Sequence, residues 1–168
     1  LFSDGAACCL IVGDEIAKRL GGELESKPTI VASQSKLYYD TLDVMGWDVK
    51  DDGLNVIFSR DIPTIIKDII KPDIESFLYK HGLSVGDVRN WIAHPGGAKV
   101  IAAYTDALNV DRGCFENTID VLRRYGNMSS VTVLYVLKEF FEKGFNSGPG
   151  LMMSLGPGFS SELVLLKS

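Results

Sequence analysis

Apolar and polar residues alternate along the chain with two periodicities, one typical of strands and the other typical of helices. Residues 6–12 (AACCLIV) form a short, wholly apolar run that a Gly-Asp pair ends, which predicts a buried strand. The β-branched first half of 27–39 and the alternation in 54–60 predict two further strands. Residues 41–53 mix Asp, Gly and Trp47, so we expect a loop there.

A helical pattern begins near Asp61, which is placed to cap its start. The isoleucines between residues 62 and 70 recur at i, i+3, i+4, i+7 and i+8 and form one apolar stripe. Pro72 is expected to kink this helix, although the stripe continues until Gly82. Three more helices are expected over residues 98–108, 112–125 and 129–144, and the last is so apolar that we expect it to be central and buried.

The remaining apolar runs predict strands. Residues 90–95 (NWIAHP) read as a short buried strand, and residues 150–167 read as two strands joined around Gly156-Pro157-Gly158. Strands that alternate with helices and close in a hairpin indicate an α/β domain with layered α/β/α architecture and a mixed sheet.

Composition excludes several classes of function. The net charge is −5 and no cluster of Lys and Arg runs along any segment, so we expect no nucleic-acid partner. No apolar run approaches the ~20 residues that span a bilayer, and no secretory leader is evident, so we expect no membrane partner. The chain opens at Leu1 inside an apolar segment, and we expect it to be a piece of a longer protein.

Three cysteines are present, without metal-ligand spacing. Cys8, Cys9 and Cys114 therefore predict neither a zinc site nor a disulfide scaffold, and a reducing, cytoplasmic location is the default expectation. Cys8 and Cys9 lie in the apolar run 6–12, where we expect them to pack as small hydrophobic residues.

Two polar residues are candidates for catalysis. His94 lies where a strand stops and a Gly-Gly turn opens a helix, a position where α/β proteins gather ligands and where the helix N-terminus favours negative charge. Asn127 lies between Gly126 and a Ser-capped helix. Each also has a purely structural explanation, His94 as a strand-end residue satisfied by the backbone and Asn127 as a turn residue. Neither position alone decides between a catalytic and a structural role.

The combination of motifs is more specific. FSDGAA (2–7), HPGG (94–97), YGNMSS (125–130) and GPG (156–158) occur in this order and at these separations. Together with GLNVIFSRDIP (53–63), they resemble the chalcone and stilbene synthases, the type III polyketide synthases. The resemblance covers essentially the whole chain and favours a bacterial member. Initiating ketoacyl carrier-protein synthases usually carry a different sequence at the histidine motif.

The resemblance implies a thiolate-based enzyme with a thiolase-like fold, built from two similar halves. Residues 1–12 would be the last strand of the amino-terminal half, and residues 13–168 would be the carboxyl-terminal half with a mixed five-stranded sheet. The full-length protein would form a homodimer. The catalytic triad of the family is Cys, His and Asn, of which this chain would supply His94 and Asn127. None of the three cysteines lies in a motif that matches the nucleophile, so we expect the isolated chain to be inactive.

The implied reaction is a decarboxylative Claisen condensation of an acyl-CoA starter with malonyl-CoA, an acyltransferase reaction of EC class 2.3.1. His94 would stabilise the cysteine thiolate, and His94 and Asn127 would donate hydrogen bonds to the enolate oxygen of the thioester. No metal, flavin or other cofactor is implied, because the coenzyme A thioester carries the reactivity. The substrate-binding positions carried over from the family are Phe2, Val56, Lys99, Ser129, Gly156 and Pro157.

Two departures from the plant enzymes bear on substrate choice. Val56 stands where those enzymes carry a second phenylalanine at the cavity mouth, and Trp47 falls near a small cavity residue of theirs. We therefore expect fatty acyl starters that yield alkylpyrones rather than a coumaroyl starter. Two alternatives remain open: a thiolase-type ketoacyl synthase that uses acyl carrier protein, and a non-catalytic fragment that serves dimer formation.

Overall fold

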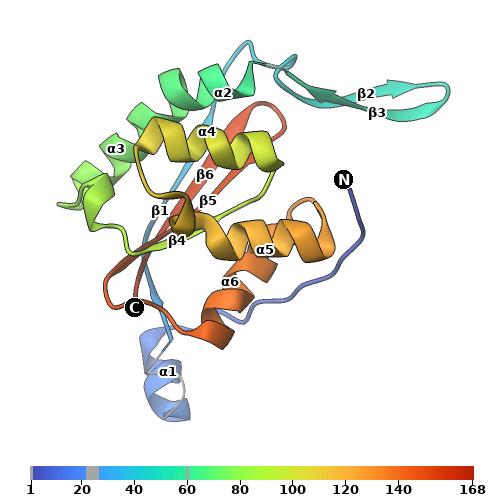
Figure 1. The fold of residues 1–168 in the computed structure, drawn as a ribbon. Coiled ribbons are helices and arrows are strands. Elements are labelled where there is room, and N and C mark those ends of the chain that lie inside the picture. Colours follow the sequence, from blue (N-terminus) through green and yellow to red (C-terminus); the bar gives the residue numbers. More distant parts are fainter. Residues whose placement is uncertain (1, 22–26, 60) are drawn as a thin grey trace.

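A mixed four-stranded sheet lies between two layers of helices in the computed structural model, which describes residues 2–21, 27–59 and 61–168 (Figure 1). The strand order is β1-β6-β5-β4. β4 and β5 pair in parallel, whereas β1 with β6 and β5 with β6 are antiparallel. The strands are β1 (Thr29–Leu37), β4 (Asn90–Ala93), β5 (Pro149–Gly156) and β6 (Ser160–Lys167).

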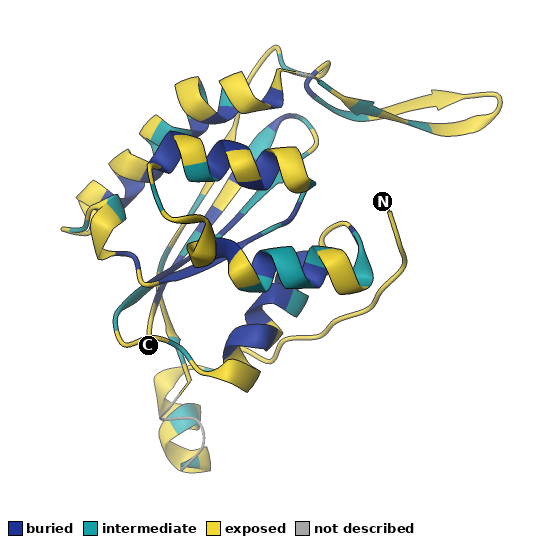
Figure 2. Cartoon of the chain, in the orientation of Figure 1, coloured by how far each residue is buried: buried dark blue, intermediate teal, exposed yellow. Residues whose placement is uncertain are grey.

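Alternating residues of the strands divide the core into two layers. In β4, Trp91 and Ala93 pack with the isoleucine-rich helices, whereas Ile92 packs on the opposite face with α6. Figure 2 shows the same division as buried inner faces and exposed outer faces of the helices. One layer holds α2 (Ile62–Ile65), α3 (Lys71–Lys80) and α4 (Ala98–Leu108), and the other holds α5 (Glu116–Tyr125) and α6 (Val131–Lys143). The α/β class with α/β/α layers is thereby confirmed.

Among the described residues the sheet has four strands, so the expected count of five is wrong. Strand β3 (Gly53–Phe58), which the sequence predicts, does not join the main sheet. It pairs instead with β2 (Met45–Lys50), in the region expected to be a loop. The sequence did carry a signal for this hairpin, because MGWDVK alternates with period two and Asp51-Asp52-Gly53 is a turn sequence.

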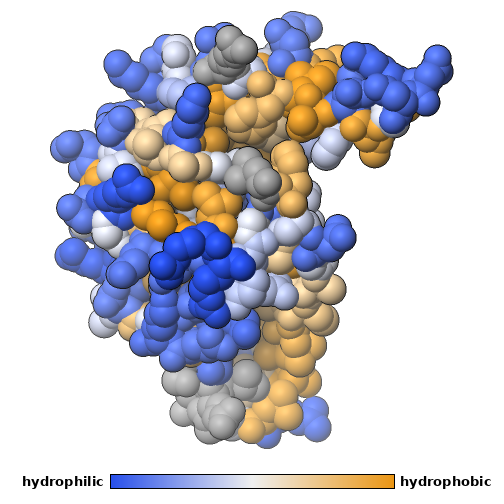
Figure 3. All heavy atoms as spheres, turned by 45° about the vertical axis from the view of Figure 1, so that its right-hand side comes forward, coloured by the Kyte–Doolittle hydropathy of each residue, from blue (hydrophilic) through white to orange (hydrophobic). Residues whose placement is uncertain are grey.

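The β2–β3 hairpin projects from the body of the molecule (Figure 1). Its register gives it one apolar face. The pairs in register on that face are Met45 with Phe58, Trp47 with Val56, and Val49 with Leu54. Successive strand residues point to opposite sides, so these pairs share one face, and the other face carries polar residues such as Asp48 and Asn55. Most of this apolar face is exposed. In Figure 3 apolar atoms gather at the base and underside of the hairpin, whereas hydrophilic atoms cover its tip.

The segment at the start of the chain differs most from expectation. Residues 6–12 are extended but form no strand, and their side chains are exposed except for a half-buried Val12. Cys8 and Cys9 are exposed, so they do not pack as core residues. A strand needs a neighbouring backbone to pair with. Among the described residues, the pairing of this first segment is limited to an isolated bridge between Phe2 and Asn127, which lies before residues 6–12. The helix α1 (Asp14–Leu20) follows it.

Two helices depart in detail from the sequence pattern. Pro72 does not break its helix; a π-helical stretch, Ile66–Ile70, precedes it and α3 continues with Pro72 in its first turn. In α6, Val136 is buried but Leu134 and Tyr135 are half-buried, so this helix lies on the sheet rather than at the centre of the core.

Candidate active site

His94 is held directly after the carboxyl end of β4. Its backbone N–H donates to the carbonyl of Met153 at 2.8 Å, which extends the parallel ladder between β4 and β5 by one residue. The preceding carbonyl, of Ala93, accepts from the hydroxyl of Thr118 on α5 at 3.2 Å. Gly97, with φ of 152°, then turns the chain into α4. The backbone around His94 is therefore fixed by hydrogen bonds to β5 and α5.

The imidazole of His94 is unpaired within the described residues. Its Nδ1 is buried and has no hydrogen-bond partner there. Burial lowers the pKa of His94 from 6.5 to about 4, because the charged form loses hydration. At neutral pH the ring is thus neutral and carries one N–H, which makes it a donor through one nitrogen and an acceptor through the other.

Asn127 lies in the turn between α5 and α6 and is only 6% exposed. Its Oδ1 accepts from the backbone N–H of Ser129 at 2.9 Å. This bond fixes the orientation of the amide, because only the oxygen can accept, and it leaves Nδ2 free to donate. The turn itself is closed by Thr132, whose hydroxyl accepts from the N–H of Met128 and donates to the carbonyl of Ser129, both at 2.8 Å.

The start of the chain packs against this turn. The N–H of Ser3 donates to the carbonyl of Asn127 at 3.0 Å, and the bridge to Asn127 brings Phe2 to the site. Gly5 crosses Met128 so closely that a Cβ at position 5 would lie 2.5 Å from the Met128 sulfur. Only glycine fits there without displacing the methionine.

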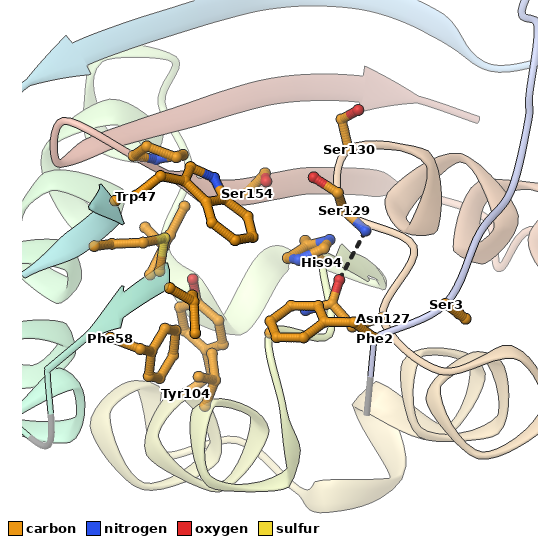
Figure 4. Close-up of a pocket in the computed structure, with 17 residues that line it drawn as sticks. Phe2, Ser3, Trp47, Phe58, His94, Tyr104, Asn127, Ser129, Ser130 and Ser154 are labelled. Carbon is orange, nitrogen blue, oxygen red and sulfur yellow. Dashed lines mark hydrogen bonds between the residues drawn. The ribbon is translucent and has the colours of Figure 1, made fainter. Parts of the chain in front are cut away.

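A cavity of about 530 Å³ joins these elements (Figure 4). It opens at the carboxyl ends of β4 and β5, where ligand sites of α/β sheets gather. The residues that line it are Phe2, Ser3, Met45, Gly46, Trp47, Val56, Phe58, His94, Gly96, Val100, Tyr104, Asn127, Ser129, Ser130, Ser154, Leu155 and Pro157.

Two walls of the cavity have different chemistry. The donor wall comprises His94, Asn127, Ser129, Ser130 and Ser154, and Figure 4 shows His94 and Asn127 directed toward the same space. The hairpin wall comprises Met45, Trp47, Val56 and Phe58 and is the inner part of the apolar hairpin face. A few polar groups facing an apolar surface are typical of a site for a small organic ligand.

Most residues expected at the site do line the cavity. They are His94, Asn127, Phe2, Val56, Ser129 and Pro157, with Trp47 directly across the ladder from Val56. Two do not line it. Lys99 is exposed on α4, and Gly156 lies between two lining residues without itself contributing. Contact of Lys99 with coenzyme A phosphates stays a prediction.

Sequence reasoning missed three prominent lining residues. Tyr104 follows Val100 by four residues, so both lie on one face of α4, and this helical spacing was a readable signal. Phe58 is paired with Met45, but this becomes visible only once the hairpin is recognised. Ser154 follows directly after Met153, the residue that binds the His94 backbone, and nothing local in the sequence marked it.

Cys8, Cys9 and Cys114 are all exposed and none lines the cavity. Across residues 2–21, 27–59 and 61–168, no three His, Cys, Asp or Glu side chains gather closely enough to hold a metal ion. Within the same ranges no helix is both long and apolar enough to cross a bilayer.

Comparison with known proteins places the chain in a family. The family model for the C-terminal domain of chalcone and stilbene synthases matches residues 29–168. A chalcone synthase-like protein of Bacillus subtilis is 44% identical over 167 residues, which cover 98% of this chain and 46% of that protein. The 1,3,6,8-tetrahydroxynaphthalene synthase of Streptomyces peucetius is 36% identical over 170 residues, which cover 99% of this chain and 44% of that protein.

A solved structure supports the same assignment. The 1,3,6,8-tetrahydroxynaphthalene synthase of Streptomyces coelicolor, a bacterial type III polyketide synthase, superposes with a TM-score of 0.78 at 26% identity. The match covers 84% of this chain and 41% of that one. The chain thus spans less than half the length of the relatives it matches. It belongs to the chalcone and stilbene synthase family and corresponds to the C-terminal domain, with the thiolase-like fold of the type III polyketide synthases.

Proposed function

We propose that this chain provides two hydrogen-bond donors, His94 and Asn127, to the active site of a type III polyketide synthase. The observation that carries the proposal is their meeting in one cavity. His94 comes from the end of β4 and Asn127 from the turn between α5 and α6, yet both line the same space. Nδ1 of His94 is buried without a partner, which leaves Nε2 as the ring nitrogen that can reach a ligand, and Nδ2 of Asn127 makes no hydrogen bond among the described residues. Two preorganised donors aimed at one point suit a reaction that develops charge on oxygen.

The proposed reaction begins with malonyl-CoA. The bond between its free carboxylate and C2 breaks, carbon dioxide leaves, and the electron pair moves onto the thioester oxygen as an enolate. An N–H of His94 and the Nδ2 of Asn127 donate to that oxygen. The enolate carbon then attacks the carbonyl of an acyl group held on a cysteine, a carbon–carbon bond forms, and the cysteine thiolate leaves. The thioester supplies the reactivity, so the proposal invokes no metal or flavin.

The nucleophilic cysteine is not among the residues that line the described cavity. We therefore propose that a cysteine from the rest of the full-length protein completes the site, and that the 168-residue chain alone is inactive. A neutral His94 beside such a thiol could accept its proton and hold the thiolate, which is the nucleophilic form.

The proposed substrates are malonyl-CoA and an acyl-CoA starter with a flexible aliphatic chain. The hairpin wall supports this choice, because Trp47, Val56 and Phe58 offer apolar surface and no charged side chain. Fatty acyl starters that yield alkylpyrones would fit such a wall. Homodimer formation by the full-length protein and a cytoplasmic location belong to the same proposal.

The test uses the full-length protein with malonyl-CoA labelled in its free carboxylate. Release of labelled carbon dioxide and condensation with acyl-CoA starters are measured together. We expect His94→Ala and Asn127→Ala each to lower the decarboxylation rate by roughly 10²–10³-fold, the typical effect of removing one such donor. The matched control is His81→Ala, since His81 is exposed at the end of α3 and does not line the cavity.

Three results would overturn the proposal. The first is a protein that releases no carbon dioxide and condenses no acyl-CoA, or whose activity survives both substitutions. The second is activity with malonate on acyl carrier protein but not on coenzyme A, which would identify a carrier-dependent synthase. The third is turnover by the 168-residue chain alone, which would contradict the external nucleophile.

A further inference from the structure

Tyr104 is a lining residue of the cavity that the proposed reaction does not use. It lies on α4, one turn after Val100, and both side chains face the cavity. Tyr104 is only 2% exposed, and its ring stacks on Phe115 with centroids 6.3 Å apart and planes at 27°. The aromatic ring is therefore held firmly by the core, and Figure 4 shows its hydroxyl end directed into the cavity.

The Tyr104 hydroxyl forms no hydrogen bond with any of the described residues, unlike that of its neighbour Tyr38. The Tyr38 hydroxyl binds Asp73 and lies 3.0 Å from the hydroxyl of Ser161. A buried hydroxyl without a partner costs free energy, so a buried tyrosine normally finds one. Tyr104 lines the cavity, and its hydroxyl is not among the fully buried atoms that lack a partner, so a water molecule or a ligand in the cavity can satisfy it.

The surroundings of the hydroxyl decide which ligand group fits. Burial, with a smaller contribution from Tyr38, raises the pKa of Tyr104 well above its ordinary value of 10.0, so the group is a neutral donor at physiological pH. Figure 4 shows Tyr104 on the same side of the cavity as Phe58 and away from Asn127 and Ser129. Val100 and the hairpin wall add only apolar atoms and the indole N–H of Trp47 here. A neutral donor among apolar side chains, with no charged group beside it, selects an uncharged oxygen acceptor.

We propose that Tyr104 is a specificity-determining residue, whose hydroxyl donates a hydrogen bond to a keto oxygen of the acyl chain in the cavity. The inference rests on the proposed function and extends it. A saturated acyl chain would leave the hydroxyl unpaired, whereas a β-ketoacyl chain, formed after one extension, would satisfy it. The residue would therefore favour intermediates over starters and position them for the next condensation.

The test compares two thioesters of equal chain length, a 3-oxoacyl-CoA and the saturated acyl-CoA, in the full-length protein. Affinity is measured by calorimetry, which requires no turnover, and kcat/KM is measured in parallel with malonyl-CoA. We expect Tyr104→Phe to reduce the preference for the 3-oxo compound by roughly 3- to 10-fold, the range of one net hydrogen bond. Tyr38→Phe is the matched control and should leave this preference unchanged, because Tyr38 does not line the cavity.

Stability gives an independent readout of the same claim. Since the Tyr104 hydroxyl has no partner in the described residues, Tyr104→Phe should fold and keep the melting temperature of the parent. Tyr38→Phe should lower it, because Asp73 and Ser161 lose a partner.

The outcomes separate this inference from the proposed function. An unchanged preference in Tyr104→Phe, or an equal loss of affinity for both thioesters, would overturn the role of Tyr104 while leaving the condensation activity standing. A protein without any condensation activity whose binding preference still depends on Tyr104 would overturn the proposed function and support the inference about binding.

Discussion

The donor wall and the hairpin wall face the same cavity but are held by the chain in opposite ways. All four residues of β4, the strand that ends at the donor wall, are buried, and Asn127 is fixed by its hydrogen bond to Ser129. The hairpin wall belongs to a two-stranded ribbon on which Trp47 is 51% exposed. In the proposed reaction, the groups that would meet a developing charge are anchored in the core, while the groups that would only adjoin the acyl chain lie on a ribbon at its margin.

The difference has a physical basis. A donor displaced by a fraction of an ångström loses much of its effect on a developing oxyanion, so it is best placed on rigid elements. Apolar contact is non-directional and tolerates movement. An isolated hairpin is marginally stable in water, so the hairpin wall is also the part of the site that can be altered with least damage to the fold.

The largest effect that separates the two regions is on stability. Leu151 on β5 is fully buried, so Leu151→Ala should lower the free energy of unfolding by about 2–5 kcal/mol. Leu54, on the apolar face of the hairpin, is 66% exposed, and Leu54→Ala should change stability by less than about 0.5 kcal/mol. Urea denaturation of the 168-residue chain measures both. Equal losses of unfolding free energy in the two variants would show that the hairpin is packed in solution, and the donor wall and the hairpin wall would then not differ in how they are held.

A pH titration tests the burial of the donor wall. Because the pKa of His94 is about 4 in the folded chain, against 6.5 for an exposed histidine, the unfolded state binds more protons between these values. Stability should therefore be greatest above pH 6.5 and fall as the pH drops toward 4, by at most about 1.4 kcal/mol per unit from this group. His94→Gln should lack this component in denaturation curves taken across that range. An identical pH dependence in both proteins would place His94 in water.

A smaller effect should appear in substrate preference. Trp47→Ala enlarges the cavity beside Val56, so kcat/KM of the full-length enzyme for a longer acyl-CoA should rise relative to a shorter one by roughly 10-fold. Val49→Ala is the control, because Val49 is the next residue on the same face and does not line the cavity. If both variants shift the preference equally, Trp47 does not limit the space.

The layers of the fold and the donor wall could be predicted from the sequence to a greater extent than the hairpin wall. Helices such as α4 and strands such as β4 follow from apolar periodicity, because their patterns reflect burial within this chain. Residues 6–12 have the same apolar signal but are exposed apart from the half-buried Val12, since the signal reports apolar character and not the neighbour that would cover it. The spacing of Tyr104 from Val100 indicates one shared face of α4, but that this face covers the cavity depends on the packing of α4, which a one-dimensional pattern does not encode.

The most direct test of the central claim is Asn127→Asp in the full-length protein, measured as carbon dioxide release from malonyl-CoA. The carboxylate retains an oxygen that can accept from the N–H of Ser129, but it lacks the amide donor. If Asn127 donates to the enolate oxygen, the rate should fall by at least roughly 10²-fold while the melting temperature stays close to that of the parent. A rate equal to that of the parent, in a folded variant, would contradict the role assigned to Asn127.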